Sequence, residues 1–327
     1  MKTWGRTLTA AGIHGPRLRD DYTRQRSLVA AYRRHAYAAV RLLLPAEVVP
    51  HVIAATAFMH HTDTLLDRGS AGAGVPAGGG RAGEDAAAWE KEVAGALASG
   101  ESGHPVLRPL LHTVSVHPGM KGHIEEFLAG ASLDRDFTGF ADESEYQRYV
   151  DAYALPAFML VAGLVLAPDA GSRPGCDAGP GPGPGPGAGA AGSRTLCRAY
   201  IDGSQRLDFV NDLAEDLRDG RLALPAEALE RHGVSRADLE QGRDTAGTRA
   251  LLAASLDRAR RDLLASRRLP GFAPPAHRAF IRAFISLEVL TADAALAKGT
   301  AVFGGPARPA VPAALGVLLR EYRRRGR

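Results

Sequence analysis

The sequence has only two cysteines among its 327 residues, Cys176 and Cys197. They flank a glycine- and proline-rich stretch and have no metal-ligand partners nearby in the sequence. We therefore expect reduced thiols without a chemical role, because neither a disulfide framework nor a zinc site can be assembled from them.

A strong charge of one sign is also missing. The chain carries 40 Lys and Arg against 36 Asp and Glu, a net charge of +4. This excess is too small to indicate a nucleic-acid partner. Arginines do gather near the C-terminus, between Arg320 and Arg325. Short charge runs of this kind are usually solvated, so we expect a basic tail at residues 318–327.

Long hydrophobic runs are absent as well. The longest apolar stretch, residues 155–167, is too short to span a bilayer and contains Pro156. Residues 1–18 lack the apolar segment of a secretory signal. We expect a cytoplasmic protein without a transmembrane segment. Peripheral contact with a membrane stays open, and a hydrophobic content of 45% is enough for a sizeable core.

The two-residue alternation of strands is missing too, and the apolar runs instead have helical spacing. The sequence therefore predicts an all-α protein. The predicted helices cover residues 32–44, 46–66, 85–97, 122–131, 143–166, 196–218, 226–232, 247–267 and 276–296.

Two glycine-rich segments separate these helices. Residues 69–83 read as a linker, and residues 168–193 contain four Gly-Pro repeats that cannot pack a core, which predicts a disordered surface insert. With residues 1–24 as an N-terminal extension, we expect one catalytic domain over residues 25–317.

Two acidic segments carry the chemistry. Asp63 and Asp67 lie four residues apart on one predicted helix, and Asp208, Asp212 and Asp216 follow the same spacing on another. Each segment presents a row of carboxylates along one helix face. Carboxylate oxygens suit Mg²⁺, whose coordination is commonly completed by substrate phosphates. The rows therefore favour a magnesium site for a diphosphate substrate.

A plainer interpretation exists for each row. The helix around Asp212 has acidic residues on one side and apolar residues on the other, which is also typical of a solvated helix. Asp63 is harder to assign to a surface, because it follows the apolar stretch 52–59 and an ionised group at the end of a buried helix needs a partner.

The second acidic segment resembles the aspartate-rich motif of the squalene/phytoene synthase family, roughly Q-x-x-N-x-x-R-D-x-x-E-D-x-x-x-G-R-x-x-x-P. Asp208 stands where the pattern has Asn, and Asn211 where it has Arg. The matching positions are Gln205, Asp212, Glu215, Asp216, Gly220, Arg221 and Pro225.

Two further segments carry the resemblance. Asp63-Thr64 is similar to the D-T form of the first motif in squalene synthases. Residues 130–134 and 143–149 resemble the family's segment between the motifs. In total, residues 25–317 follow the family's order and spacing, which implies an isoprenoid synthase helical bundle with a central cavity.

The resemblance also implies roles for individual residues. Asp63, Asp67, Asp212 and Asp216 would hold Mg²⁺ and act in catalysis, and Asp208 could join them. Gln205 belongs to the substrate-binding motif. Arg221, Arg33 and Arg34 are candidates for binding phosphate oxygens, because a guanidinium is a planar fork. For Arg33 and Arg34 a surface role is an equal alternative.

His60 stands where the family has Arg before the first motif. It could ligate metal, donate to phosphate or take a proton from an acceptor, and the alternative is a packing histidine. A zinc site is not expected, because no cysteine or third histidine has a suitable spacing. Around Tyr37, a candidate for substrate binding, Arg34 and Ala36 replace the family's small hydroxyl residues.

The segment after Tyr149 departs most clearly from the pattern Y-x-x-x-V-A-G-x-V-G. Tyr153 replaces valine, and Leu155 and Phe158 replace the glycines. Added volume would narrow a cavity built for two long prenyl chains. Tyr149, Tyr153 and Phe158 are therefore candidates for binding substrate, and the rings could stack on an aromatic acceptor or shield an allyl cation. They could also simply fill the core.

Within the family, the chain resembles the phytoene-synthase-like aromatic prenyltransferases of secondary metabolism. This resemblance implies a Mg²⁺-dependent enzyme that joins a short allylic diphosphate to a small aromatic acceptor of the carbazole or indole type. The first alternative is head-to-head condensation of two prenyl diphosphates to squalene or phytoene. An isoprenoid cyclase and a non-catalytic isoprenoid-binding homologue are further alternatives. Unpaired carboxylates have no structural use in an apolar cavity, which argues against the last of these.

Overall fold

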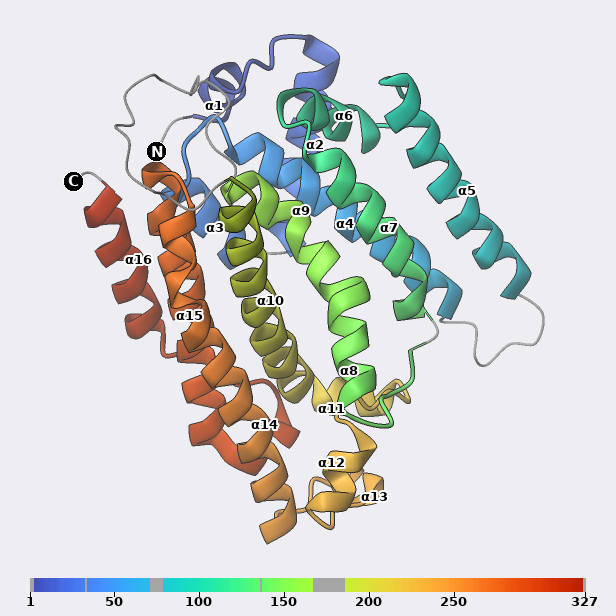
Figure 1. Cartoon of the computed structure of the whole chain (residues 1–327), viewed down its shortest axis with the longest axis vertical. Coiled ribbons are helices and arrows are strands. Elements are labelled where there is room, and N and C mark those ends of the chain that lie inside the picture. Colours follow the sequence, from blue (N-terminus) through green and yellow to red (C-terminus); the bar gives the residue numbers. More distant parts are fainter. Residues whose placement is uncertain (1–2, 33, 71–78, 136, 167–185, 326–327) are drawn as a thin grey trace. The chain divides into compact units, whose positions relative to one another are not determined.

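The regular structure of the protein is helical. The computed structural model describes residues 3–32, 34–70, 79–135, 137–166 and 186–325 (Figure 1). Within these ranges no strand forms, and the one β-type contact is an isolated bridge between Gly139 and Leu222. The predicted all-α class is confirmed.

The chain divides into two compact units, each built from discontinuous segments. Unit 1 comprises residues 1–136, 156–182 and 273–280, and unit 2 comprises residues 137–155, 183–272 and 281–327. The first predicted acidic segment therefore belongs to unit 1 and the second to unit 2.

Unit 1 is organised around a long central helix. Its helices are α1 (Trp4–Ala10), α2 (Pro16–Tyr32), α3 (Arg34–Leu43), α4 (Val49–Ser70), α5 (Gly79–Ser99), α6 (Leu107–Val116), α7 (Met120–Arg135) and most of α9 (Leu155–Leu166). Helix α4 packs against α2, α5, α6 and α7. Its first half is almost fully buried, including Ile53 and Phe58. Pro50 lies in its first turn, where a missing N–H costs nothing.

Unit 2 is organised around the pair α10 and α14. Its helices are α8 (Glu143–Tyr149), the π-helical turn η1 (Val150–Ala154), α10 (Pro186–Asn211), α11 (Leu213–Arg218), α12 (Ala226–Arg231), α13 (Arg236–Glu240), α14 (Ala246–Ala265), most of α15 (Arg278–Lys298) and α16 (Val311–Arg325). Gly203 allows α10 and α14 to approach closely, because an added Cβ would lie 2.6 Å from the carbonyl oxygen of Ala259. Figure 1 shows these two helices and the neighbouring α15.

Several helix limits differ from the sequence-based expectation. Helix α10 begins at Pro186, so residues 186–193 of the predicted insert are helical. Alanines in this segment favour helix, and proline is well placed at a first helical position. The rest of the insert, residues 168–185, lies outside the described residues, as does Cys176. The predicted linker 69–83 is shorter, because α4 continues to Ser70 and α5 begins at Gly79.

Both chain ends contain helices that the sequence reading omitted. Residues 4–24 contain α1 and the first half of α2, and they contribute to the core of unit 1 through buried Leu8, Ile13 and Tyr22. Residues 318–325, expected as a solvated tail, belong to α16. The expected limits of the catalytic domain remain a prediction.

One helical run in the described part of the chain, Glu143–Leu166, is long and apolar enough to cross a membrane by length and composition. Of its apolar window, 56% is buried within the protein. A core helix meets the same criteria, so the run gives no argument for insertion into a bilayer.

Cys197 is a buried free cysteine on α10. Burial raises the pKa of its thiol to about 12, with Arg194 acting in the opposite direction. The thiol is therefore protonated at neutral pH, and a protonated thiol is a poor nucleophile.

Candidate active site

The first acidic row lies in the second half of α4. Thr62 accepts a hydrogen bond from the indole nitrogen of Trp89 on α5 at 3.0 Å, and Phe58 packs against the same indole. These contacts fix the rotation of α4. His60 and Asp63 lie on the opposite side of the helix and are half-buried. Asp67 belongs to the same helix, but its side chain lies outside the described part of the structure.

His60 is held by an aromatic contact. Its ring stacks on Tyr32 of α2 with centroids 4.0 Å apart and planes inclined by 23°. A stacked imidazole keeps both nitrogens at its edge, so the contact orients the ring without using its hydrogen-bonding atoms. The imidazole is thus oriented one helical turn before Asp63. This geometry agrees with a packing histidine and equally with a proton acceptor.

The remaining predicted residues of unit 1 lie at the start of α3 and on α9. Arg34 is exposed and Tyr37 is half-buried, whereas Arg33 lies outside the described residues. Phe158, on α9, is half-buried. Their roles in substrate binding remain predictions.

The second acidic row crosses the junction between α10 and α11. The backbone N–H of Asp212 donates to the carbonyl of Asp208 at 2.8 Å, and that of Asp216 donates to the carbonyl of Asp212 at 2.9 Å. The four-residue helical spacing therefore continues through the junction. The three carboxylates follow one another on one side of unit 2, as the sequence spacing predicts.

The row becomes more buried towards Asp216. Asp208 and Asp212 are exposed, whereas the side chain of Asp216 is 14% exposed. Burial raises the pKa of Asp216, and repulsion from Asp212, Asp219 and Glu215 acts in the same direction, while Arg221 opposes them. The Asp216 carboxylate is thus in an environment with excess negative charge, which a bound cation would relieve.

A glycine turn brings Arg221 back to this row. Gly220 adopts a φ of 81°, a conformation that other residues avoid. The N–H of Arg221 then donates to the carbonyl of Asp216 at 2.8 Å, and its guanidinium lies 3.5 Å from the Asp216 carboxylate. Arg221 is half-buried, so a cationic fork lies beside the row.

The chemistry of the row fits Mg²⁺. Three carboxylates at four-residue spacing supply hard oxygen donors, and Mg²⁺ usually takes only one or two protein carboxylates together with water and substrate phosphates. Among the described side chains, no group of three or more His, Cys, Asp or Glu residues is placed so that it could hold a metal ion by itself. Binding of Mg²⁺ by this row remains a prediction.

Asn211, at the family's Arg position, has a structural contact. It is buried, and its side-chain oxygen accepts a hydrogen bond from the N–H of Ala307 at 2.9 Å. This contact attaches the segment before α16 to the end of α10. The departure from the motif thus changes a cationic position into a neutral one that stabilises unit 2.

Aromatic rings lie beside the N-terminal end of the second row, next to Asp208. Tyr149 contacts Tyr153 with ring centroids 5.4 Å apart and Phe209 at 6.1 Å, and Phe209 directly follows Asp208 in the chain. Tyr149 and Tyr153 are almost fully buried. Gln205, on the same helix as Asp208, is half-buried. The predicted residues Tyr149, Tyr153, Asp208 and Asp212 therefore belong to one unit.

The π-helical turn η1 coincides with the clearest departure from the family pattern. It covers Val150–Ala154, so Tyr153 lies within it and Leu155 directly after it. A π turn inserts an extra residue into a helix and changes the direction of the side chains that follow. The role of this segment in substrate binding remains a prediction.

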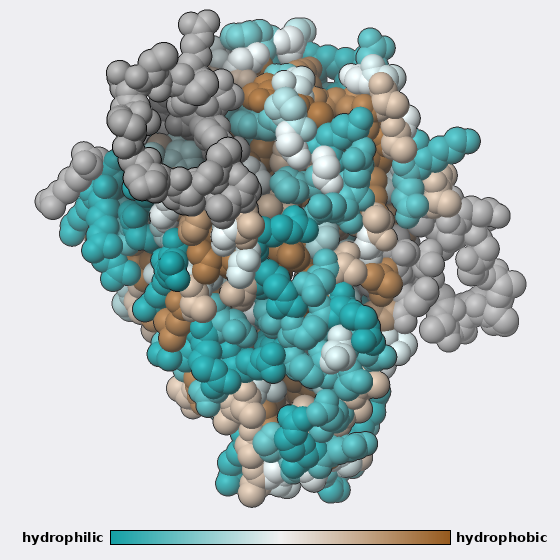
Figure 2. Space-filling view, in the orientation of Figure 1, coloured by the Kyte–Doolittle hydropathy of each residue, from teal (hydrophilic) through white to brown (hydrophobic). Residues whose placement is uncertain are grey.

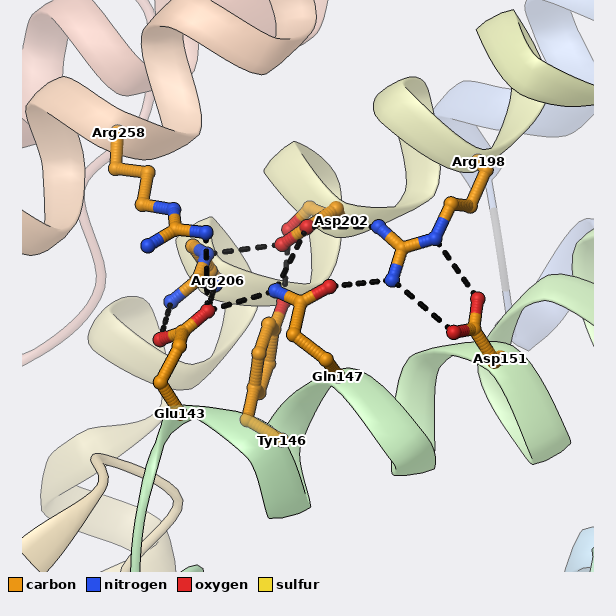
Figure 3. Close-up of polar contacts among 8 residues, drawn as sticks. All are labelled: Glu143, Tyr146, Gln147, Asp151, Arg198, Asp202, Arg206 and Arg258. Carbon is orange, nitrogen blue, oxygen red and sulfur yellow. Dashed lines mark hydrogen bonds and ion pairs between the residues drawn. The ribbon is translucent and has the colours of Figure 1, made fainter.

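A polar ladder joins α8 and η1 to α10 (Figure 3). Arg206 is bound by both Asp202, at 2.9 Å, and Glu143, and its guanidinium lies 3.9 Å from the ring centre of Tyr146. Burial acts to raise the pKa of Asp202, but Arg206 and further donors outweigh it and hold the pKa below its ordinary value. The members of the ladder are Glu143, Tyr146, Gln147, Asp151, Arg198, Asp202, Arg206 and Arg258.

Sequence reasoning missed this ladder and the stack of Tyr32 on His60. A signal for the ladder exists, because Arg198, Asp202 and Arg206 repeat every four residues, as do Glu143, Gln147 and Asp151. Two facing series of this kind indicate paired helices. The stack has no such signal, because its partners come from separate helices.

The comparisons with known proteins identify the family. The sequence model of the squalene/phytoene synthase family matches residues 29–314. The chain therefore belongs to the squalene/phytoene synthase family, a family of prenyltransferases. A curated relative, the bifunctional protein CrtB/UppS of Streptomyces coelicolor, is 25% identical over 254 residues. The match covers 76% of this chain and 39% of that protein, so the chain corresponds to well under half of the relative's length.

Solved structures support the same fold. The squalene synthase HpnC from Alicyclobacillus acidocaldarius is 22% identical, with a TM-score of 0.69 over 91% of this chain and 99% of that chain. A dehydrosqualene synthase in complex with a ligand is 16% identical, with a TM-score of 0.74 over 94% and 97%. The fold is therefore the all-helical isoprenoid synthase fold, as the resemblance implied. The central cavity remains a prediction.

Proposed function

We propose that the protein is a Mg²⁺-dependent prenyltransferase that transfers a short allylic group to a small aromatic acceptor of the carbazole or indole type. The observation that carries the acceptor is the segment after Tyr149. Buried Tyr153 and Leu155, half-buried Phe158 and a π-helical turn occupy the place where the family pattern has valine and two glycines. Bulky rings leave less room for a second long prenyl chain and provide faces for an aromatic molecule.

The residues that would hold Mg²⁺ are Asp63 and Asp67 on α4 together with Asp208, Asp212 and Asp216 of the second row. Bound Mg²⁺ supplies positive charge that offsets the charge developing on departing diphosphate. Arg221 contributes a fixed guanidinium to the same phosphate oxygens. Its turn at Gly220 keeps this cation beside Asp216 before substrate arrives.

The other residues act on the organic part of the reaction. The ring faces of Tyr149 and Tyr153 attract a delocalised cation and exclude water from it. A ring carbon of the acceptor bonds to C1 of the allylic group, and the proton on that ring carbon must then leave. His60 is the candidate base, because its stacked imidazole is oriented and carries a nitrogen that can accept a proton.

The test is donor and acceptor preference. Wild-type protein is incubated with dimethylallyl, geranyl or farnesyl diphosphate, with and without carbazole or indole, and products are identified by mass. We expect acceptor-dependent product with the short donor. Tyr153→Val and Phe158→Gly should shift preference towards longer donors, whereas exposed Leu133→Val should not. Preference for long donors in wild type would contradict the proposal.

Head-to-head condensation is the second candidate. The similar structures named squalene synthase and dehydrosqualene synthase favour it by name. The same incubation separates the two reactions, because condensation yields a C30 or C40 hydrocarbon from farnesyl or geranylgeranyl diphosphate without any acceptor. Efficient formation of such a product would establish this alternative. We further propose a location in the cytoplasm, tested by fractionation of native cells with a high-salt wash that releases protein bound at a membrane surface.

A further inference from the structure

The C-terminal helix α16 carries an apolar stripe that faces solvent. Val311, Leu315, Leu319 and Tyr322 are 69%, 58%, 49% and 47% exposed. Their spacing of four, four and three residues places them along one side of the helix. We call these four residues the α16 stripe. Isolated exposed apolar side chains are ordinary, but a continuous row marks a surface for interaction.

The opposite side of α16 is anchored to unit 2. Glu321 is 1% exposed and is bound by Arg282 of α15 at 2.6 Å, with Arg324 at 3.1 Å and Arg320 at 3.5 Å. Val317, one turn earlier, is also buried. The buried carboxylate therefore fixes the rotation of the helix about its axis and keeps the stripe turned outward.

Cations border the stripe at its C-terminal end. Helical spacing places Arg323 beside one edge of the stripe and Arg325 beside the other. Figure 2 shows the hydrophilic surface over this end of α16, which lies beside α15 in Figure 1. Tyr322 lies between Arg323 and Arg325 around the helix. It has an apolar ring with a polar tip, as residues at a lipid–water boundary have.

We propose that α16 docks on an anionic lipid surface, with the α16 stripe at the boundary between headgroups and acyl chains and the arginines on lipid phosphates. An apolar row beside clustered arginines is the pattern of a helix that lies in a membrane interface. A second copy of the chain fits less well, because a stable interface between copies uses about 20–30 residues on each side. The stripe offers four. This inference does not depend on the reaction proposed above.

The experiment measures binding of the full chain to vesicles. Wild type is sedimented with vesicles of phosphatidylcholine alone or with added phosphatidylglycerol, at low and raised salt. We expect binding only with phosphatidylglycerol, and weaker binding at raised salt. Leu315→Ser with Leu319→Ser should weaken partition at least ~10-fold. Arg323→Gln with Arg325→Gln should weaken it about 25-fold, on the usual fivefold for each basic residue near the surface.

The matched control is Leu133→Ser, because Leu133 on α7 is 51% exposed. This variant should bind vesicles as wild type does. All variants are compared by melting temperature, which should not change because the altered side chains are exposed. Wild type that ignores anionic vesicles overturns the proposal, and so does full binding by the double leucine variant. A dimer in solution that the leucine changes dissociate, without vesicle binding, assigns the stripe to a second copy instead and also overturns it.

Discussion

Acid should unfold unit 1 through a buried histidine. His51 on α4 is 2% exposed, and its Nδ1 lies 3.0 Å from the hydroxyl oxygen of Thr113. That hydroxyl donates to the carbonyl of Pro109 at 2.9 Å, so the Nδ1–H of His51 donates to the hydroxyl oxygen. Burial lowers the pKa of His51 to about 3, with repulsion from His117 and His112 adding to the effect.

The direction in which stability changes with pH follows from the difference in proton binding between the folded and unfolded states. The unfolded chain takes up a proton near pH 6.5, whereas folded His51 does so only near pH 3. The contribution of His51 to stability is therefore complete above pH 6.5 and is lost as the pH falls towards 3. Each pH unit in this window lowers the free energy of unfolding by about 1.4 kcal/mol, so at pH 4.5 the loss through His51 alone is roughly 2.7 kcal/mol.

The assay is urea denaturation between pH 7.5 and pH 4.5. Both tryptophans, Trp4 and Trp89, belong to unit 1, so their fluorescence reports on this unit. His51→Gln keeps a donor for Thr113 without titrating, and its free energy of unfolding should fall with acid by roughly 2–3 kcal/mol less than that of wild type. Exposed His14→Gln should behave as wild type. Equal pH dependence of wild type and His51→Gln would refute the reasoning.

Further predictions concern unit 2. Gly203→Ala should lower the free energy of unfolding by about 1–3 kcal/mol, because its Cβ would also lie 2.9 Å from Leu263. The control Gly122→Ala on α7, which has open space around it, should be neutral or stabilising. Chemical denaturation measures both. Arg206→Met should lower the free energy of unfolding by about 3–5 kcal/mol, because buried Asp202 and half-buried Glu143 would keep their charges with one cation fewer. The control Arg231→Met removes an exposed ion pair and should lower it by under ~1 kcal/mol. A loss below ~1 kcal/mol for Arg206→Met would contradict the role of the ladder.

Much of the fold was readable because its main helices have strong local signals. Helix α4 and the run from α8 to α9 combine apolar spacing with few breakers, and both were predicted close to their observed positions. Helix α2 was missed because it is rich in charged residues, although Pro16 marks its first position. Helix α16 was taken for a tail because the burial of Glu321 depends on Arg282, which is 39 residues away in the chain.

The candidate site likewise contains features that the sequence predicted and features that it could not predict. The spacing of Asp208, Asp212 and Asp216 predicted one row, and backbone hydrogen bonds preserve that spacing across a helix junction that the sequence did not indicate. The hydrogen bond that Asn211 accepts from Ala307 could not be predicted, because the two residues are 96 positions apart in the chain. Local periodicity therefore identifies rows of side chains, whereas tertiary contacts decide which neighbours support them.

The central claim is that two acidic rows support Mg²⁺-dependent departure of diphosphate. The most direct measurement is the rate of diphosphate release from dimethylallyl diphosphate, with acceptor present, as Mg²⁺ is titrated. Asp63→Asn and Asp212→Asn should each lower turnover by ~10²-fold or more without a change in melting temperature, because leaving-group stabilisation supplies several kcal/mol. Exposed Asp257→Asn on α14 should keep wild-type turnover. Turnover within a few-fold of wild type in both row variants, or full activity in excess EDTA, would contradict the account.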